Sequence, residues 1–221
     1  MDHCNFKTVL FDFDYTLADS SRGVFECINY ALEKMDLPQA PFDRVCRMIG
    51  LSLSETLHRL TGESRPELAE AFTRLVIEKG DQVMADRTVL FEAVPKTMEK
   101  LIRHGLAVGI VSTKLRRRIE AILRRDNCFH LFNVIVGGED VAVHKPDPRG
   151  LFSAMNQLCS EPAETLYVGD SVVDAESARR AGIGFVAVLS GVTPEIDFKE
   201  FPTLGIINHV SELPEQIGGL R

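Results

Sequence analysis

Five apolar runs recur along the chain, and each is followed by a polar turn and then by a pattern typical of a helix. They cover residues 8–13, 106–112, 132–137, 165–170 and 184–190, and a shorter run covers 204–208. Nearly continuous apolar strands are typical of strands buried on both faces, which favours a parallel sheet. Strands that alternate with helices therefore predict an α/β fold, with a Rossmann-like parallel sheet and helices on both of its faces.

The stretch 19–86 departs from this alternation, because it contains no convincing strand. Three sets of apolar residues recur there at helical spacing, around 24–35, 53–60 and 68–76, and Pro66 stands near the start of the third. We therefore expect an all-helical domain at 19–86, inserted into a core domain formed by 1–18 and 87–221.

Composition indicates a soluble globular protein, since 45% of the 221 residues are hydrophobic and 26% are charged. No apolar run approaches the roughly 18 residues that cross a bilayer, and the first seven residues lack the features of a signal peptide. The five cysteines, without CxxC spacing, indicate free thiols in a reducing compartment; they are Cys4, Cys27, Cys46, Cys128 and Cys159. We expect a cytoplasmic protein with no membrane partner, either a monomer or a homodimer.

The net charge of −7 and the sequence pI of about 5.4 bear on the class of partner. Binding a polyanion usually needs a basic face, so we expect no nucleic-acid partner. A small anionic substrate is compatible with this charge, because one lysine and one metal ion dominate the field of a small pocket.

Polar side chains follow the first four strands of the predicted core. They are Asp12 and Asp14 after the first, Ser112, Thr113 and Lys114 after the second, Lys145 after the third, and Asp170 and Asp174 after the fourth. The carboxyl ends of parallel strands meet at one edge of the sheet, which is where open α/β sheets bind ligands. The sequence therefore predicts one polar site at this edge.

Each of these residues, taken singly, has an ordinary structural explanation. Asp170 and Ser112 are suited to capping helices, Asp14 to an Asx-turn, and a loop lysine is usually solvated. The joint pattern favours function, because four carboxylates at one edge repel one another unless a cation lies between them. A hard divalent ion such as Mg²⁺ takes oxygen ligands and suits this set.

In these positions the chain resembles the haloacid dehalogenase-like hydrolases. "DFDYTL" is similar to their first motif, DxDxT, and Ser112 stands at the place of their second. Lys145 in "HKPDP" is similar to the third motif, and "GDSVVDAE" to the fourth. The four occur in order from Asp12 to Asp174, and such an ordered set is far more specific than any one motif. The helical insertion resembles the cap domain of the phosphoglycolate phosphatase-like subgroup.

The resemblance implies a role for each residue at this edge. Asp12 would be the nucleophile that forms an aspartyl-phosphate, and Asp14 the general acid and then the general base. Ser112 and the Thr113 backbone would donate hydrogen bonds to the phosphoryl oxygens, and Lys145 would neutralise charge. The implied Mg²⁺ ligands are Asp12, the backbone carbonyl of Asp14, Asp170, and Asp174 directly or through water.

Weaker assignments concern the residues around this set. Thr16 keeps its place in the first motif and would hydrogen-bond near the phosphate, and Lys114, beside the second motif, is a candidate substrate contact. Gly50 and Ser52 lie in a segment that resembles the substrate-facing cap loop, although packing and helix capping explain them nearly as well. Tyr15 stands where the family most often has Gly, which tolerates backbone angles that Tyr resists.

The resemblance implies a Mg²⁺-dependent phosphatase acting on a small phosphorylated metabolite, a phosphomonoester similar to phosphoglycolate. A pyrophosphatase and a β-phosphoglucomutase-like sugar phosphomutase stay open as alternatives. The mutase is less favoured because the segment with Gly50 lacks a basic residue to hold a second phosphate. From a different class, a receiver-like phospho-acceptor module uses the same residue types, but its acidic pair precedes its phosphorylated Asp and it has no inserted domain.

Overall fold

The computed structural model describes residues 6–219, which divide into two compact units. The first unit is built from 6–18 and 90–219, and the second is Asp19–Val89. The chain passes from one to the other through two short strands that pair with each other, β2 (Ala18–Asp19) and β3 (Val89–Leu90).

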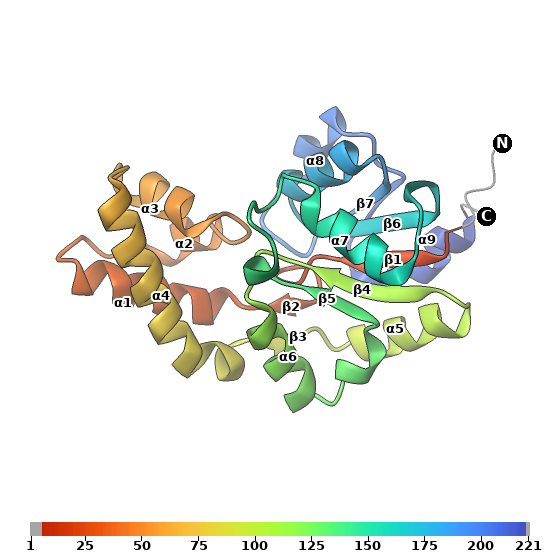
Figure 1. Cartoon of the computed structure of the whole chain (residues 1–221), viewed down its shortest axis with the longest axis horizontal. Helices are drawn as coiled ribbons and strands as arrows, with labels where there is room; N and C mark the ends of the chain where they lie inside the picture. Colours follow the sequence, from red (N-terminus) through yellow and green to blue (C-terminus); the bar gives the residue numbers. More distant parts are fainter. Residues whose placement is uncertain (1–5, 220–221) are drawn as a thin grey trace. The chain divides into compact units, whose positions relative to one another are not determined.

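The first unit contains a six-stranded sheet in the order β5-β4-β1-β6-β7-β8 (Figure 1). Every neighbouring pair in it is parallel, and β1 lies between β4 and β6. The strands are β1 (Thr8–Phe11), β4 (Ala107–Val111), β5 (Val134–Val136), β6 (Thr165–Gly169), β7 (Gly184–Val188) and β8 (Gly205–Ile207). This arrangement confirms the predicted α/β fold, and all six predicted strands are present.

Helices cover both faces of this sheet, as predicted. Side chains alternate along β1: Val9 and Phe11 join the core under α5, α6 and α9, whereas Leu10 joins the core under α7 and α8. All three side chains are fully buried. The helices are α5 (Val94–Arg103), α6 (Arg116–Arg125), α7 (Arg149–Leu158), α8 (Val172–Ala181) and α9 (Leu213–Gly219). Figure 1 shows α7 and α8 on one side of the sheet and α5 and α6 on the other.

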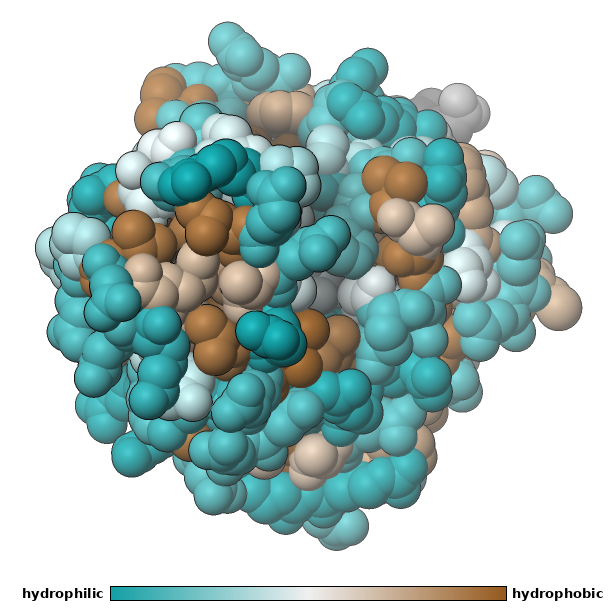
Figure 2. Space-filling model, turned by 60° about the vertical axis from the view of Figure 1, so that its left-hand side comes forward, coloured by the Kyte–Doolittle hydropathy of each residue, from teal (hydrophilic) through white to brown (hydrophobic). Residues whose placement is uncertain are grey.

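Short 3₁₀ helices occur in the connections, at Phe129–Leu131, Gly138–Asp140, Pro162–Glu164, Glu195–Glu200 and Val210–Glu212. None of the four described cysteines forms a disulfide, as predicted for them, and Cys4 lies outside the described residues. Within 6–219, every helix is too short or too polar to cross a membrane. The face drawn in Figure 2 is mostly hydrophilic, with apolar side chains in small groups.

The second unit consists of helices with a core of their own. They are α1 (Ser21–Lys34), α2 (Phe42–Cys46), α3 (Leu53–Thr61) and α4 (Pro66–Arg87). Helices α1 and α4 pack closely at Gly23, where a Cβ atom would lie 2.7 Å from the sulfur of Met84. The sequence pattern predicts three of these helices and misses α2, which is only five residues long and has no apolar repeat.

Candidate active site

Three carboxylates converge at the carboxyl edge of the sheet. Asp12 follows β1, and its backbone N–H donates to the carbonyl oxygen of Val168 in the neighbouring strand β6 at 2.9 Å. Asp170 follows β6, and Asp174 lies in the first turn of α8. One carboxylate oxygen of each lies within 4.8 Å of the others, and all three residues are buried. Asp12 thus meets Asp170 and Asp174, which are 158 or more positions away in the sequence, because β1 and β6 are adjacent.

Lys145 joins this cluster from the connection between β5 and α7. Its Nζ atom lies 2.8 Å from Oδ1 of Asp12 and 2.6 Å from Oδ1 of Asp174, and its side chain is only 5% exposed. Burial by itself lowers the pKa of Lys145, but Asp12 and Asp174 outweigh it and hold that pKa well above its ordinary value. Lys145 is therefore a buried cation rather than a solvated loop residue.

Both oxygens of Asp174 are engaged by protein groups. Oδ1 is within hydrogen-bond distance of Lys145 and of the Tyr167 hydroxyl, at 3.1 Å. Oδ2 accepts a hydrogen bond from the hydroxyl of Ser171 at 2.6 Å, in a capping box at the start of α8. Ser171, and not Asp170, is the N-cap of this helix. Asp174 therefore fixes the position of Lys145, and Asp170 is left to face the cluster.

The carboxylates of Asp12 and Asp170 lie in an environment that disfavours their negative charge. Burial, reinforced by Asp174 and Asp14 and opposed by Lys145, raises the pKa of Asp12 to about 6. Burial and the charges of Asp174 and Asp12 likewise hold the pKa of Asp170 well above its usual range.

These residues fit a divalent cation. Oδ1 of Asp12 is buried, and apart from its ion pair with Lys145 it has no hydrogen-bond partner among the described residues. The edge holds four aspartates, three of which form ion pairs with two lysines, so its net charge is −2 when all are ionised (2 − 4 = −2). A hard dication with oxygen ligands would neutralise that excess, and Asp12, Asp170 and Asp174 could hold it.

Asp14 belongs to a separate ion pair. Its Oδ1 atom lies 2.8 Å from Nζ of Lys114, and both residues are buried. The backbone N–H of Lys114 donates to the hydroxyl of Ser112 at 3.3 Å, which ties the pair to the end of β4. The structure thus brings Asp14, Lys114 and Ser112 together at the same edge, with Thr113 between the last two.

The turn of the first motif is braced by a loop after β7. Tyr15 has a φ of 61°, in the left-handed region that Gly adopts most easily, and its carbonyl accepts from the Ser190 hydroxyl at 2.6 Å. The next residue, Thr16, is fully buried, and its hydroxyl lies 3.4 Å from Oδ1 of Asp170. At Gly191 a Cβ atom would lie 2.0 Å from Oδ2 of Asp170, so a larger residue there would displace the Asp170 carboxylate.

Sequence reasoning missed Tyr167, Ser171 and Ser190 as supports of the site. Tyr167 stands in an otherwise aliphatic strand, "TLYVGD", where a buried hydroxyl needs a partner. The spacing of Ser171 and Asp174 is that of a capping box, which was a usable signal. Ser190 had no local signal, because its partner Tyr15 is 175 positions away.

The family model described as haloacid dehalogenase-like hydrolase matches residues 9–188, which include every predicted site residue, whereas Ser190 and Gly191 lie just beyond it. The chain belongs to this family. It is therefore a hydrolase, and its four motifs are the positions that converge at the sheet edge.

Named relatives of this hydrolase are phosphatases. A phosphoglycolate phosphatase of Salmonella typhimurium is 30% identical over 208 residues, covering 85% of this chain and 82% of that protein. The pyrophosphatase PpaX of Bacillus mycoides is 31% identical, covering 82% and 83%. A crystal structure of a haloacid dehalogenase-like hydrolase from Bacteroides fragilis has a TM-score of 0.91 and 41% identity, covering 94% of this chain and 99% of that one.

Two predicted site residues of the hydrolase, Gly50 and Ser52, belong to the second unit. Gly50 has a φ of 93°, which favours glycine, and Ser52 is the N-cap of α3, its hydroxyl accepting from the backbone N–H of Glu55. These local roles account for both residue types. A role for either residue in substrate binding stays a prediction.

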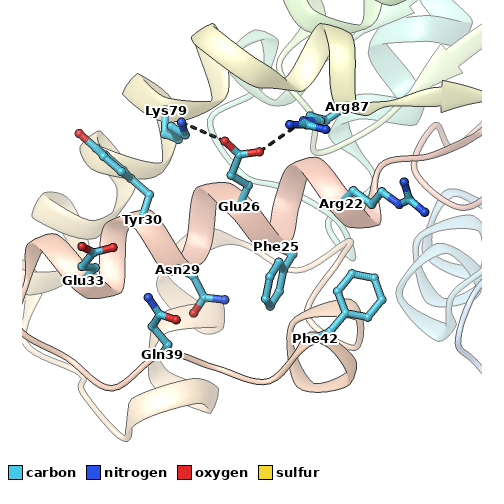
Figure 3. A pocket seen from close by; sticks show the side chains of 10 residues that line it. All are labelled: Arg22, Phe25, Glu26, Asn29, Tyr30, Glu33, Gln39, Phe42, Lys79 and Arg87. Atoms are coloured by element: carbon cyan, nitrogen blue, oxygen red, sulfur yellow. Dashed lines mark ion pairs between the residues drawn. The ribbon is translucent and has the colours of Figure 1, made fainter.

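The second unit also contains a hollow of about 540 Å³, lined mainly by α1, α4 and the segment before α2 (Figure 3). Glu26 lies on its wall, with Lys79 at 2.9 Å and Arg87 at 3.4 Å on either side. Phe25 and Phe42, which both line it, meet edge to face, with ring centroids 5.3 Å apart. Glu26 is thus paired with two neighbouring cations, and the hollow has no excess of carboxylates, since Arg22 and Glu33 are the other charged residues that line it.

Proposed function

We propose that this hydrolase is a Mg²⁺-dependent phosphatase of small phosphomonoesters, similar to phosphoglycolate, which works through an aspartyl-phosphate on Asp12. One observation carries the proposal: the buried carboxylate of Asp12 lies against Lys145 and within the cluster of Asp170 and Asp174. Its similarity to a phosphoglycolate phosphatase supports the same class of substrate.

Each residue then has a defined part in the first step. An oxygen of Asp12 attacks phosphorus and the bond to the ester oxygen breaks, while Asp14 gives its proton to that oxygen. Ser112 and the Thr113 backbone donate hydrogen bonds to the phosphoryl oxygens, and Lys145 neutralises charge on Asp12 and the phosphate. Asp12, the backbone carbonyl of Asp14, Asp170, and Asp174 directly or through water would hold Mg²⁺, which would supply charge neutralisation and alignment of the phosphoryl group.

The second step returns the enzyme to its starting state. Asp14, now ionised, takes a proton from the water that attacks phosphorus, and the bond between Asp12 and phosphorus breaks to release phosphate. We further propose that the helical unit, residues 19–86 by sequence and Asp19–Val89 by contacts, acts as a cap that selects the substrate and excludes water during the first step.

A pyrophosphatase is the second candidate, and the similarity to PpaX favours it. The same residues would act in the same steps, with phosphate in place of an alcohol as the leaving group. Transfer of the phosphoryl group to a second sugar hydroxyl, as in a mutase, would need the water of the second step to be excluded.

The test is phosphate release from a panel of phosphomonoesters, pyrophosphate and hexose phosphates, with Mg²⁺ and with EDTA. We expect Mg²⁺-dependent turnover that is greatest for a small phosphomonoester and is absent in Asp12→Asn. Asp197→Asn, an exposed change in the same unit, is the matched control and should retain full turnover. Turnover by Asp12→Asn at the wild-type rate would overturn the proposed nucleophile.

A further inference from the structure

The two carboxylates of the first motif are held by different lysines. Asp12 pairs with Lys145, whereas Asp14 pairs with Lys114, and the four side chains are at most 11% exposed. Lys145 also contacts Asp174, but Lys114 has Asp14 as its one carboxylate partner among the described residues. The proton-transferring residue therefore has a buried cation of its own.

Lys114 is fixed at both ends. Its backbone N–H donates to Ser112, and its carbonyl accepts from the N–H of Gly138 at 3.0 Å. Its Nζ atom lies 5.7 Å from the centroid of the Phe13 ring, within the range of a cation–π contact. A lysine restrained in this way holds its ammonium group at one place, beside Asp14.

The two oxygens of Asp14 are not equivalent. Oδ1 accepts from Lys114 at 2.8 Å, and Lys114 is the one side chain among residues 6–219 that donates to this carboxylate. An ammonium group bound to Oδ1 fixes the rotation of the carboxyl group and leaves Oδ2 as the oxygen that can exchange a proton.

We propose that Lys114 is a positioning residue, which binds Oδ1 of Asp14 so that Oδ2 gives and takes the proton in both steps. The inference rests on the proposed function of Asp14. In the first step the O–H bond at Oδ2 breaks and the proton goes to the leaving oxygen, while Lys114 keeps its own protons and stabilises the carboxylate that forms. In the second step Oδ2 takes the proton from the attacking water.

A substrate contact by Lys114 would have a different signature from a positioning role. Loss of a contact that is equal in the ground and transition states raises KM, whereas misplacement of Asp14 lowers kcat. The requirement for a proton also depends on the leaving group. An alkoxide leaves only when it is protonated, whereas dinitrophenolate leaves without a proton.

The experiment compares Lys114→Met with wild type on phosphoglycolate and on 2,4-dinitrophenyl phosphate, by rapid mixing. We expect kcat on phosphoglycolate to fall about 100-fold or more, with KM changed less than about threefold. On the dinitrophenyl ester the burst of the first step should change less than about threefold, and the later steady state should slow as much as on phosphoglycolate. Lys114→Arg, which can still donate to Oδ1, should recover at least about a tenth of kcat.

The double variant Asp14→Asn/Lys114→Met keeps the inference testable if Lys114→Met alone fails to fold, because it removes both buried charges together. Its kcat on phosphoglycolate should equal that of Asp14→Asn alone, since Lys114 acts only through Asp14. The inference would be overturned if Lys114→Met changed KM without changing kcat. It would also be overturned if the burst rate on the dinitrophenyl ester fell as much as kcat on phosphoglycolate, or if the double variant had a lower kcat than Asp14→Asn. If Asp12→Asn stayed active on both esters, the proposed function itself would fail.

Discussion

Charged side chains gather in two regions of this molecule, and the two regions differ in how far those side chains are exposed to solvent. At the sheet edge, the side chains of Asp12, Lys145 and Asp174 are at most 5% exposed. In the hollow of the helical unit, the side chain of Glu26 is 35% exposed, and those of its partners Lys79 and Arg87 are 22% and 57% exposed. Solvent screens the second set and not the first.

The sign of the charge balance also differs. Carboxylates outnumber lysines at the sheet edge, whereas the hollow is lined by three cations and two carboxylates, one of which, Glu26, pairs with two of the cations. Taking several charges out of water is costly, and a like-charge excess adds repulsion to that cost. An excess of buried carboxylates is expected where a cation binds, which is why we propose that the reaction takes place at the sheet edge.

The largest expected effect is the loss of activity in Asp12→Asn. Removing a nucleophile lowers kcat by about 10⁴-fold or more. The same change brings the charge of the sheet edge nearer to neutral, and Lys145 keeps Asp174 as a partner. We therefore expect the metal-free variant to be at least as stable as the metal-free wild type, measured by urea unfolding in EDTA. A variant that is both inactive and markedly less stable would contradict this account of the charge balance.

Lys145→Met should have the opposite effect on stability. It leaves Asp12 and Asp174 buried without their shared cation, and an uncompensated buried charge costs about 3–5 kcal/mol of unfolding free energy. Lys79→Met is the matched control in the hollow, where the partly exposed pair contributes about 1 kcal/mol or less. Equal losses in the two variants, by urea unfolding at one ionic strength, would remove the distinction between the regions.

Binding of Mg²⁺ should stabilise the wild type through the sheet edge alone. At about 100 times its dissociation constant, a ligand of the folded state adds about 2.7 kcal/mol, which raises Tm by about 5–10 °C in a chain of this size. Asp170→Asn should lose most of this shift, and Asp197→Asn should keep it. A shift that survives in Asp170→Asn would place the cation elsewhere.

Much of the fold could be predicted because the physical signals are local. The strand at 8–13 and its partners are apolar runs that only a doubly covered sheet can bury. Ile102 and Phe152 show the limit of helical patterns: both stand beside core positions in sequence, yet they are 41% and 40% exposed. Periodicity identifies which side of a helix is buried, but not which residues at the boundary of that side are exposed.

The sequence predicts which motif residues lie at the site, but not how the residues around them pair. Asp12, Ser112, Lys145 and Asp170 follow successive strands, so topology alone brings them together. The pairing of Lys114 with Asp14 joins residues 100 positions apart and depends on the path of a loop, for which the sequence carries no local pattern.

The smallest expected effect is that of Glu26→Gln in the hollow. The change removes both ion pairs of Glu26 but leaves a side chain of the same shape, so the unfolding free energy should fall by about 1 kcal/mol or less. Because these charges are partly exposed, the difference from wild type should shrink further in about 1 M salt, where the Debye length is about 3 Å. Urea unfolding at low and high salt measures it. A loss of several kcal/mol that is insensitive to salt would show that the hollow shields its charges as the sheet edge does.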